Sequence, residues 1–195
     1  MTHNTKGSSE NYIQKTELGY DGFFKVKRHT IQYPKFSGEP SKIHNREVLV
    51  REPTVGALVF DPVNKKVLFT EQFRIGALEA KDEPWVFELP AGIVEQGEDP
   101  KTAIQRELIE ETGYQVNDLE FIGQFYLSPG GTSEKSTIYY AEADLSHDGV
   151  HGATGENEDI KTHCIDLKTA LGWIGTKTIS ASAAIGLLWL ASKNK

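Results

Sequence analysis

Three glutamates near the middle of the chain, Glu107, Glu110 and Glu111, have the residue type and the spacing that suit a divalent cation. On an α-helix, which turns about 100° per residue, all three fall within an arc of about 100°, and Glu107 and Glu111 stand one turn apart. Like charges at this spacing destabilise a bare helix, whereas a hard divalent cation prefers carboxylate ligands and would remove the repulsion. The pattern therefore predicts a metal site on one side of a helix.

A second interpretation of these glutamates is a solvated acidic face with a surface salt bridge to Arg106. Their place on the helix argues against it, because Glu111 projects between Glu107 and the apolar pair Ile104 and Leu108. A carboxylate beside the buried stripe is costly unless a metal or an arginine compensates its charge. We therefore favour the metal site.

The helix that must carry the glutamates has clear signals at both ends. Asp99 is a good N-cap, and Pro100 suits the first helical position. Gly113 supplies a left-handed stop directly after Thr112. The sequence therefore predicts a helix over residues 100–112.

Strands are expected on both sides of this helix, where apolar runs are bounded by Gly, Pro, Ser or Asn. The predicted strands cover residues 20–28, 29–36, 46–52, 54–60, 66–73, 85–89, 119–127, 137–143 and 160–167. A hairpin turn is expected at 61–64, a Gly- and acid-rich loop at 148–159, and two further helices at 167–174 and 180–192. Mixed strands with interspersed helices indicate an α/β fold, built as an α/β/α sandwich with a mixed sheet.

The N-terminal part is expected to be organised separately. Residues 1–10 are polar and predict a mobile tail, and residues 11–52 predict a small antiparallel β subdomain. Residues 53–195 then form the main domain that carries the glutamate helix.

Composition narrows the class of protein. The chain has 195 residues, of which 38% are hydrophobic and 25% charged, as in a globular protein with a real core. A net charge of −7 and a pI near 5.4 argue against nucleic acid as a partner. An anionic substrate stays compatible with that charge, since a few arginines or metal ions can hold a pyrophosphate.

Three further classes are disfavoured. Cys164 is the single cysteine, which excludes a disulfide framework and a thiolate zinc cluster within one chain and suits a small packed residue. The first ten residues contain no apolar stretch typical of a signal peptide. The longest apolar stretch, residues 179–191, is too short to span a bilayer. We therefore expect a cytoplasmic protein with no membrane partner.

The helix and the turn before it belong to a longer pattern. It reads Gly, five residues, Glu, seven residues, Arg-Glu, an apolar residue, any residue, Glu-Glu, any residue, Gly and a final apolar position. This resembles the Nudix box, with its positions filled by Gly92, Glu98, Arg106, Glu107, Leu108, Glu110, Glu111, Gly113 and Tyr114. Tyr114 is slightly unusual, since this position is more often aliphatic. The chain is thus identified as a member of the Nudix hydrolase superfamily.

The resemblance implies hydrolysis of a diphosphate, with Mg²⁺, or Mn²⁺ in its place, as the cofactor. The ligands that it implies are Glu107 and Glu111, Glu110 as a secondary or water-mediated ligand, and the backbone carbonyl of Ala91. Arg106 and Glu98 look structural in the family, with Arg106 positioning the acidic side chains. Gly92 and Gly113 look like positions where a Cβ would obstruct the backbone.

A loop beyond the box points to a substrate. Pro129 lies fifteen residues past Tyr114, in the run Ser-Pro-Gly-Gly-Thr-Ser-Glu over 128–134. A proline at this place resembles the ADP-ribose pyrophosphatase subgroup, and the amides of a Gly-rich loop can approach a ligand closely. Ser128 and Gly130 are therefore candidate substrate contacts. The other interpretation is an ordinary hairpin loop.

An acidic run, Gly-Glu-Asn-Glu-Asp-Ile over 155–160, resembles the mobile loop that supplies a catalytic base and a further metal ligand in this subgroup. By match, Glu156 would be the base and Glu158 the ligand. A disordered acidic loop is the other interpretation.

Aromatic residues and arginines upstream resemble the adenine and pyrophosphate contacts of the subgroup. Arg46 could stack on adenine, Phe23 could form the other stacking face, and Arg74 could hold phosphate. The other interpretation is strand packing and surface charge. The choice of the stacking aromatic among Tyr20, Phe23 and Phe24 stays open.

In the mechanism implied by the resemblance, two or three magnesium ions hold the substrate and a polarised water attacks one phosphorus, giving AMP and ribose 5-phosphate. Subgroup members are homodimers whose N-terminal strands exchange, so a nucleotide sugar and a second copy of this chain are the expected partners.

Three other hypotheses stay open. The substrate could be GDP-mannose, ADP-glucose or another nucleoside diphosphate sugar. A Nudix-fold regulator could bind ADP-ribose without cleaving it, although the intact acidic set argues against that. A calcium-buffering domain would lack the nucleotide, and no EF-hand pattern supports it.

Overall fold

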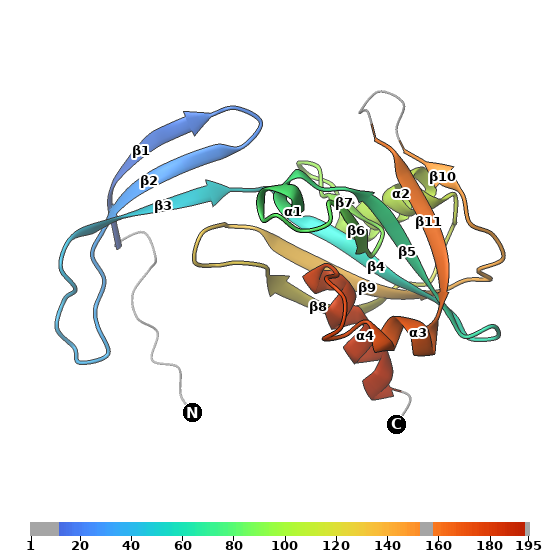
Figure 1. The fold of residues 1–195 in the computed structure, drawn as a ribbon. Helices are drawn as coiled ribbons and strands as arrows, with labels where there is room; N and C mark the ends of the chain where they lie inside the picture. Colours follow the sequence, from blue (N-terminus) through green and yellow to red (C-terminus); the bar gives the residue numbers. More distant parts are fainter. Residues whose placement is uncertain (1–11, 153–157, 194–195) are drawn as a thin grey trace. The chain divides into compact units, whose positions relative to one another are not determined.

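The computed structural model describes residues 12–152 and 158–193. The chain divides into two compact units, shown in Figure 1. The first unit combines Met1–Arg51 with Ser128–Glu134, and the second combines Glu52–Leu127 with Lys135–Lys195. The expected N-terminal tail, residues 1–10, lies outside the described residues.

The first unit contains a three-stranded antiparallel sheet in the order β1-β2-β3, formed by β1 (Ile13–Asp21), β2 (Lys25–Ile31) and β3 (His44–Val50). The expectation of one strand over 20–28 is wrong, because the hairpin between β1 and β2 lies inside it. The turn is tight: Gly22 donates its N–H to the Phe24 carbonyl at 3.0 Å. Apolar and aromatic residues continue through this turn, so the sequence alternation conceals it.

The Gly-rich loop Ser128–Glu134 extends the edge of β3 within the first unit. Leu49 donates its N–H to the Gly131 carbonyl at 2.8 Å, and its carbonyl accepts the N–H of Ser133 at 3.0 Å. The Ser133 hydroxyl oxygen also accepts the N–H of Arg51 at 2.9 Å. The loop is therefore held by main-chain pairing like an added strand.

The second unit is built on a mixed sheet of eight strands. Six strands follow the order β10-β11-β5-β4-β9-β8, with β6 paired to β5 and β7 to β4. These strands are β4 (Thr54–Asp61), β5 (Lys66–Phe73), β6 (Trp85–Glu88), β7 (Ala91–Ile93), β8 (Glu120–Tyr126), β9 (Lys135–Glu142), β10 (Val150–His151) and β11 (Ile160–Asp166). The pair β4 and β9 is parallel and the other pairs are antiparallel.

Two helical layers cover opposite faces of this sheet (Figure 1). Alternate residues of β4 separate the two cores: Val55, Ala57 and Val59 pack with α2 (Pro100–Thr112). Leu58 and Phe60 pack with α3 (Leu167–Gly172) and α4 (Ala181–Lys193). This alternation is the period of a strand, and it confirms the expected α/β/α sandwich.

The turn between β4 and β5 is fastened by Asp61, whose side chain is buried. Its carboxylate accepts the N–H groups of Val63, Asn64 and Leu145 and the side-chain amide of Asn64. The Asn64 backbone and side-chain bonds, more than the other contacts, lower the pKa of Asp61 to about 2. The hairpin expected at 61–64 is confirmed.

Three short elements lie where the sequence predicted none, and one of them is β7, whose three residues pair with β4. The helix α1 (Ile75–Glu79) has five residues, too few to show a helical period. The strand β10 lies inside the expected loop 148–159 and depends on a distant partner, since His151 pairs with Ile160. Among the helices of the described ranges, none has the length and apolar character to cross a membrane.

Candidate active site

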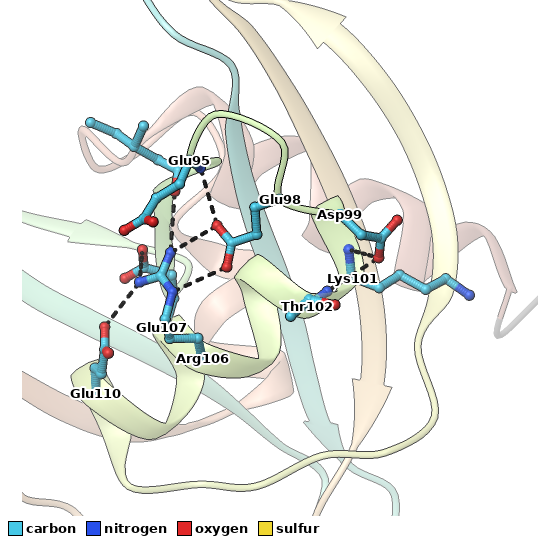
Figure 2. Close-up of polar contacts among 9 residues, drawn as sticks. Glu95, Glu98, Asp99, Lys101, Thr102, Arg106, Glu107 and Glu110 are labelled. Carbon is cyan, nitrogen blue, oxygen red and sulfur yellow. Dashed lines mark hydrogen bonds and ion pairs between the residues drawn. The ribbon is translucent and has the colours of Figure 1, made fainter.

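The glutamate helix α2 begins and ends where its capping residues lie. The Asp99 carboxylate accepts the N–H groups of Lys101 and Thr102, and Pro100 opens the helix (Figure 2). Gly113 follows with a φ of 71°, which is the left-handed region that favours glycine. The predicted helix over 100–112 is therefore confirmed, and it places its glutamates beside strand β7.

Glu111 is a buried carboxylate, with only 4% of the residue exposed. It accepts the backbone N–H of Ala91 at 2.9 Å, which joins α2 to β7. Burial raises the pKa of Glu111 to about 8, and the charges of Glu107 and Glu158 act in the same direction. The Ala91 N–H and the more distant Arg74 oppose the rise without cancelling it. A cation beside Glu111 would compensate this cost.

Glu107 lies directly against Gly92, which follows Ala91 in β7. A Cβ at Gly92 would stand 1.9 Å from the Glu107 carboxyl carbon, so only glycine fits while Glu107 keeps this position. Burial raises the pKa of Glu107 and Arg106 opposes the rise, while Glu110 and Glu158 add to it. The first two residues of β7, Ala91 and Gly92, thus contact the carboxylates of Glu111 and Glu107.

Arg106 gathers the remaining acidic side chains (Figure 2). Its guanidinium lies 2.8 Å from the Glu107 carboxylate and 3.1 Å from that of Glu110. It also donates two bonds of 3.2 Å to Glu98, whose other role is to accept the N–H of Glu95 at 3.1 Å. The Glu98 bonds, followed by the charge of Glu107, raise the pKa of Arg106. Arg106 therefore holds the loop before α2 and orients Glu107.

These residues fit a hard divalent cation by the chemistry of their donors. Glu107 and Glu111 are adjacent carboxylates of raised pKa, one of them almost fully buried. Oxygen donors of this kind are the ligands that Mg²⁺ and Mn²⁺ take. Within residues 12–152 and 158–193, no group of three or more His, Cys, Asp or Glu side chains is already gathered as a metal site. A cation would therefore need further oxygen ligands, such as water or substrate phosphate.

A cavity of about 490 Å³ lies at the end of β5 in the second unit. It is lined by Gln72, Phe73, Arg74, Trp85, Glu158 and Asp159. The Arg74 guanidinium bonds to Glu88 at 2.7 Å, and the charges of both Arg74 and Glu158 act on Glu111. The structure thus brings the proposed phosphate contact Arg74 and the proposed ligand Glu158 into one cavity. The proposed base, Glu156, lies outside the described residues.

The remaining candidates belong to the first unit. Phe23 is 85% exposed and its ring meets that of Phe24 edge-on at 4.9 Å. Arg46 is exposed, and its guanidinium bonds to the Asn45 carbonyl at 3.0 Å. Nothing lies within 4 Å of a Cβ built at Gly130.

Ser128 begins the Gly-rich loop, and its carbonyl accepts the N–H groups of Gly131 and Thr132. Sequence reasoning missed Arg51, whose guanidinium lies 4.7 Å above the Phe24 ring and 3.6 Å from Glu134. The only signal was a basic residue at the end of an aromatic-rich segment.

A model of the NUDIX domain matches residues 50–179, more than half of the chain. Together with the sandwich fold and the glutamates carried on α2, this match defines the class: the chain belongs to the Nudix family. Among solved structures, a crystal structure of an ADP compounds hydrolase aligns with a TM-score of 0.72 and 20% identity. The alignment covers 93% of this chain and 92% of that one, and it concerns the fold alone.

Curated relatives include two ADP-ribose pyrophosphatases and a GDP-mannose pyrophosphatase. The chain is 37% identical over 188 residues to the ADP-ribose pyrophosphatase of Escherichia coli, covering 95% of this chain and 90% of the relative. It is 38% identical over 176 residues to the ADP-ribose pyrophosphatase of Haemophilus influenzae, covering 88% and 81%. It is 30% identical over 177 residues to a GDP-mannose pyrophosphatase of Escherichia coli, covering 90% and 92%.

Gly92→Ala is expected to lower turnover with little loss of fold. The added methyl needs the space of the Glu107 carboxylate, the flexible end of a side chain, so Glu107 moves while the sheet stays. We expect kcat to fall by about 10- to 100-fold, as for the loss of groups that orient metal ligands. Gly76→Ala is the matched control, because nothing lies within 4 Å of a Cβ built there. Equal kcat values in the two variants would contradict the role given to Gly92.

Proposed function

We propose that this chain hydrolyses the pyrophosphate bond of ADP-ribose, giving AMP and ribose 5-phosphate, with Mg²⁺ as the cofactor and Mn²⁺ able to replace it. The observation that carries the chemistry is the carboxylate pair Glu107 and Glu111 of α2, which contacts Ala91 and Gly92 of β7, with Glu111 buried. The substrate is supported by the two ADP-ribose pyrophosphatases, at 37% and 38% identity.

In this proposal the residues of α2 provide the metal site. Glu107 and Glu111 are the main ligands, Glu110 is a secondary ligand, and the Ala91 carbonyl and Glu158 complete the set. When bound, the metal neutralises phosphate charge and makes water more acidic. Arg106 keeps Glu107 in place through its 2.8 Å ion pair.

Two further groups act on the substrate and the water. Arg74 binds a phosphate oxygen from the cavity that it lines with Glu158. Glu156 accepts the proton of the attacking water as a general base. The new P–O bond forms as the bridging P–O bond breaks, and AMP leaves with ribose 5-phosphate as the second product.

The first unit supplies the contacts to the nucleotide. Phe23 and Arg46 stack on the two faces of adenine. The loop residues Ser128 and Gly130 contact the substrate through the backbone amides of the loop. We propose a homodimer in which the N-terminal strands are exchanged, since large apolar side chains of β1 and of the turn after it are exposed, among them Leu18, Tyr20 and Phe23. A cytoplasmic location remains a prediction.

A substrate panel tests the proposal. ADP-ribose, ADP-glucose and GDP-mannose would each be incubated with the protein and Mg²⁺, with and without a chelator, and nucleoside monophosphate would be measured. We expect AMP from ADP-ribose at the highest kcat/KM and none with chelator. GDP-mannose is the second candidate because of the relative at 30% identity. Binding of ADP-ribose without any product would instead indicate a regulator.

Removal of residues 1–36 is expected to weaken both self-association and substrate affinity. The deletion removes β1, β2 and the turn between them, which include the exposed apolar side chains of Leu18, Tyr20 and Phe23. Loss of one stacking contact should raise KM about 5- to 100-fold. Light scattering would report the mass, and steady-state kinetics the KM. Removal of residues 2–10 alone is the control, and a monomeric 37–195 chain with unchanged KM would contradict the exchanged dimer.

A further inference from the structure

Tyr114 ends the signature segment and fills a position where an aliphatic residue is more usual. Its ring is buried in the core beside α2, and its hydroxyl makes two bonds to His147 and lies 3.8 Å from the Cys164 sulfur. The hydroxyl donates to the His147 carbonyl at 2.7 Å and accepts the His147 N–H at 3.2 Å. The phenol ring also stacks on the His147 imidazole at 4.8 Å. An aliphatic side chain could make none of these polar bonds.

His147 belongs to a segment, residues 145–152, which we call the stem. The stem runs from the buried turn of Asp61, which accepts the Leu145 N–H, to Gly152 after β10. On its other side it is fastened to β11: Asp148 accepts the Cys164 N–H at 2.7 Å, and Gly149 donates to the Thr162 hydroxyl at 2.7 Å. These bonds fix the stem to the sheet.

The end of the stem touches Glu158. A Cβ at Gly152 would lie 2.6 Å from the Glu158 carbonyl oxygen, so the two backbones are in close contact. Gly152 has a φ of 128°, a conformation that side chains rarely adopt. Glu158 in turn acts electrostatically on Glu107 and Glu111, the carboxylates of α2. The contacts therefore run from the end of α2 through Tyr114, His147 and the stem to Glu158, whose charge acts on the carboxylates of α2.

We propose that Tyr114 is a positioning residue whose hydroxyl, by holding His147, sets the place of Glu158 relative to the carboxylates of α2. The inference rests on the proposed function only in taking Glu158 as a metal ligand. Without the hydroxyl, the His147 N–H loses its acceptor. The His147 carbonyl then accepts only the weaker bond from the Cys164 S–H, at 3.4 Å. The stem then loosens at His147, and Glu158 is less well placed.

Tyr114→Phe tests the inference, because it keeps the ring and removes the hydroxyl. Mn²⁺ affinity is measured on the nucleotide-free protein by electron paramagnetic resonance, and amide exchange is followed over residues 145–152. We expect Mn²⁺ to bind about tenfold more weakly, as when a group behind a ligand is lost, with faster exchange in the stem. Tyr139→Phe is the matched control: Tyr139 is buried in the same core cluster and packs against Phe121. It should leave Mn²⁺ affinity unchanged.

A double-mutant cycle separates positioning from a purely structural effect. If Tyr114 acts through Glu158, then Tyr114→Phe should change Mn²⁺ affinity by less than about twofold in the Glu158→Gln background. An additive loss in that background, or unchanged affinity in the single variant, would overturn the inference. If the Phe variant does not fold, Tyr114→Leu replaces it in the same cycle. Because Mn²⁺ binding needs no nucleotide, failure to cleave ADP-ribose would refute the proposed function without deciding this point.

Discussion

Glu107→Gln and Glu111→Gln are each expected to lower kcat/KM for ADP-ribose by about 10²- to 10³-fold or more at saturating Mg²⁺. The loss of a well-placed electrostatic group in an active site typically has a cost of this size. Each variant keeps the shape of the side chain but removes a charged oxygen donor. Steady-state rates over a magnesium titration provide the measurement, and Glu79→Gln, an exposed glutamate of α1, is the matched control.

The thermal stability of Glu111→Gln should move differently from its activity. Burial of this carboxylate is unfavourable without a cation, so the neutral amide should cost little stability in a chelator, and Tm should stay level or rise. Its oxygen can still accept the Ala91 N–H. With Mg²⁺ added, only the parent protein should gain Tm, because a ligand stabilises the state that binds it. If Mg²⁺ did not raise the Tm of the parent protein, or if the variant kept a near-normal rate, Glu111 would not be a ligand.

Local signals in the sequence predicted the parts of the fold that local contacts hold. The bounds of α2 follow from Asp99, Pro100 and Gly113, all of which act on the helix end beside them. The elements that were missed depend on distant partners or are very short. The strand β10 has two residues and pairs with β11, β7 has three residues and pairs with β4, and α1 has five residues. The predicted strand over 20–28 missed the hairpin between β1 and β2, because aromatic residues continue through its turn.

The candidate site divides in the same way. Spacing on one helix predicted that Glu107 and Glu111 would lie on one side, and both contact the start of β7, at Ala91 and Gly92. Contacts across the fold could not be predicted from spacing. Arg51 meets Phe24, and Tyr114 meets His147, thirty-three residues further along the chain. Such pairs are set by which segments the sheet brings together, a property of topology rather than of local pattern.

Substitution of Glu156 or Glu158 should also lower activity strongly. The two losses should depend differently on the concentration of magnesium. Glu156→Gln keeps the shape and removes the base, so kcat should fall by about 10²- to 10⁴-fold at every magnesium concentration, with little change in KM. Glu158→Gln removes one oxygen ligand while Glu107 and Glu111 remain. Its defect should therefore shrink as Mg²⁺ is raised, because mass action offsets a weakened site.

The structure sharpens the expectation for Glu158. It lines the cavity that also contains Arg74, and its charge adds to the effect of burial, which is the main cause that raises the pKa of Glu107 and Glu111. Asp159 lines the same cavity, so Asp159→Asn is the matched control for loss of a negative charge there. Rates of all three variants across a magnesium titration decide between the roles. Small, equal and magnesium-independent effects at 156 and 158 would mean that the acidic run is solvated, and that the base lies among Glu107, Glu110 and Glu111.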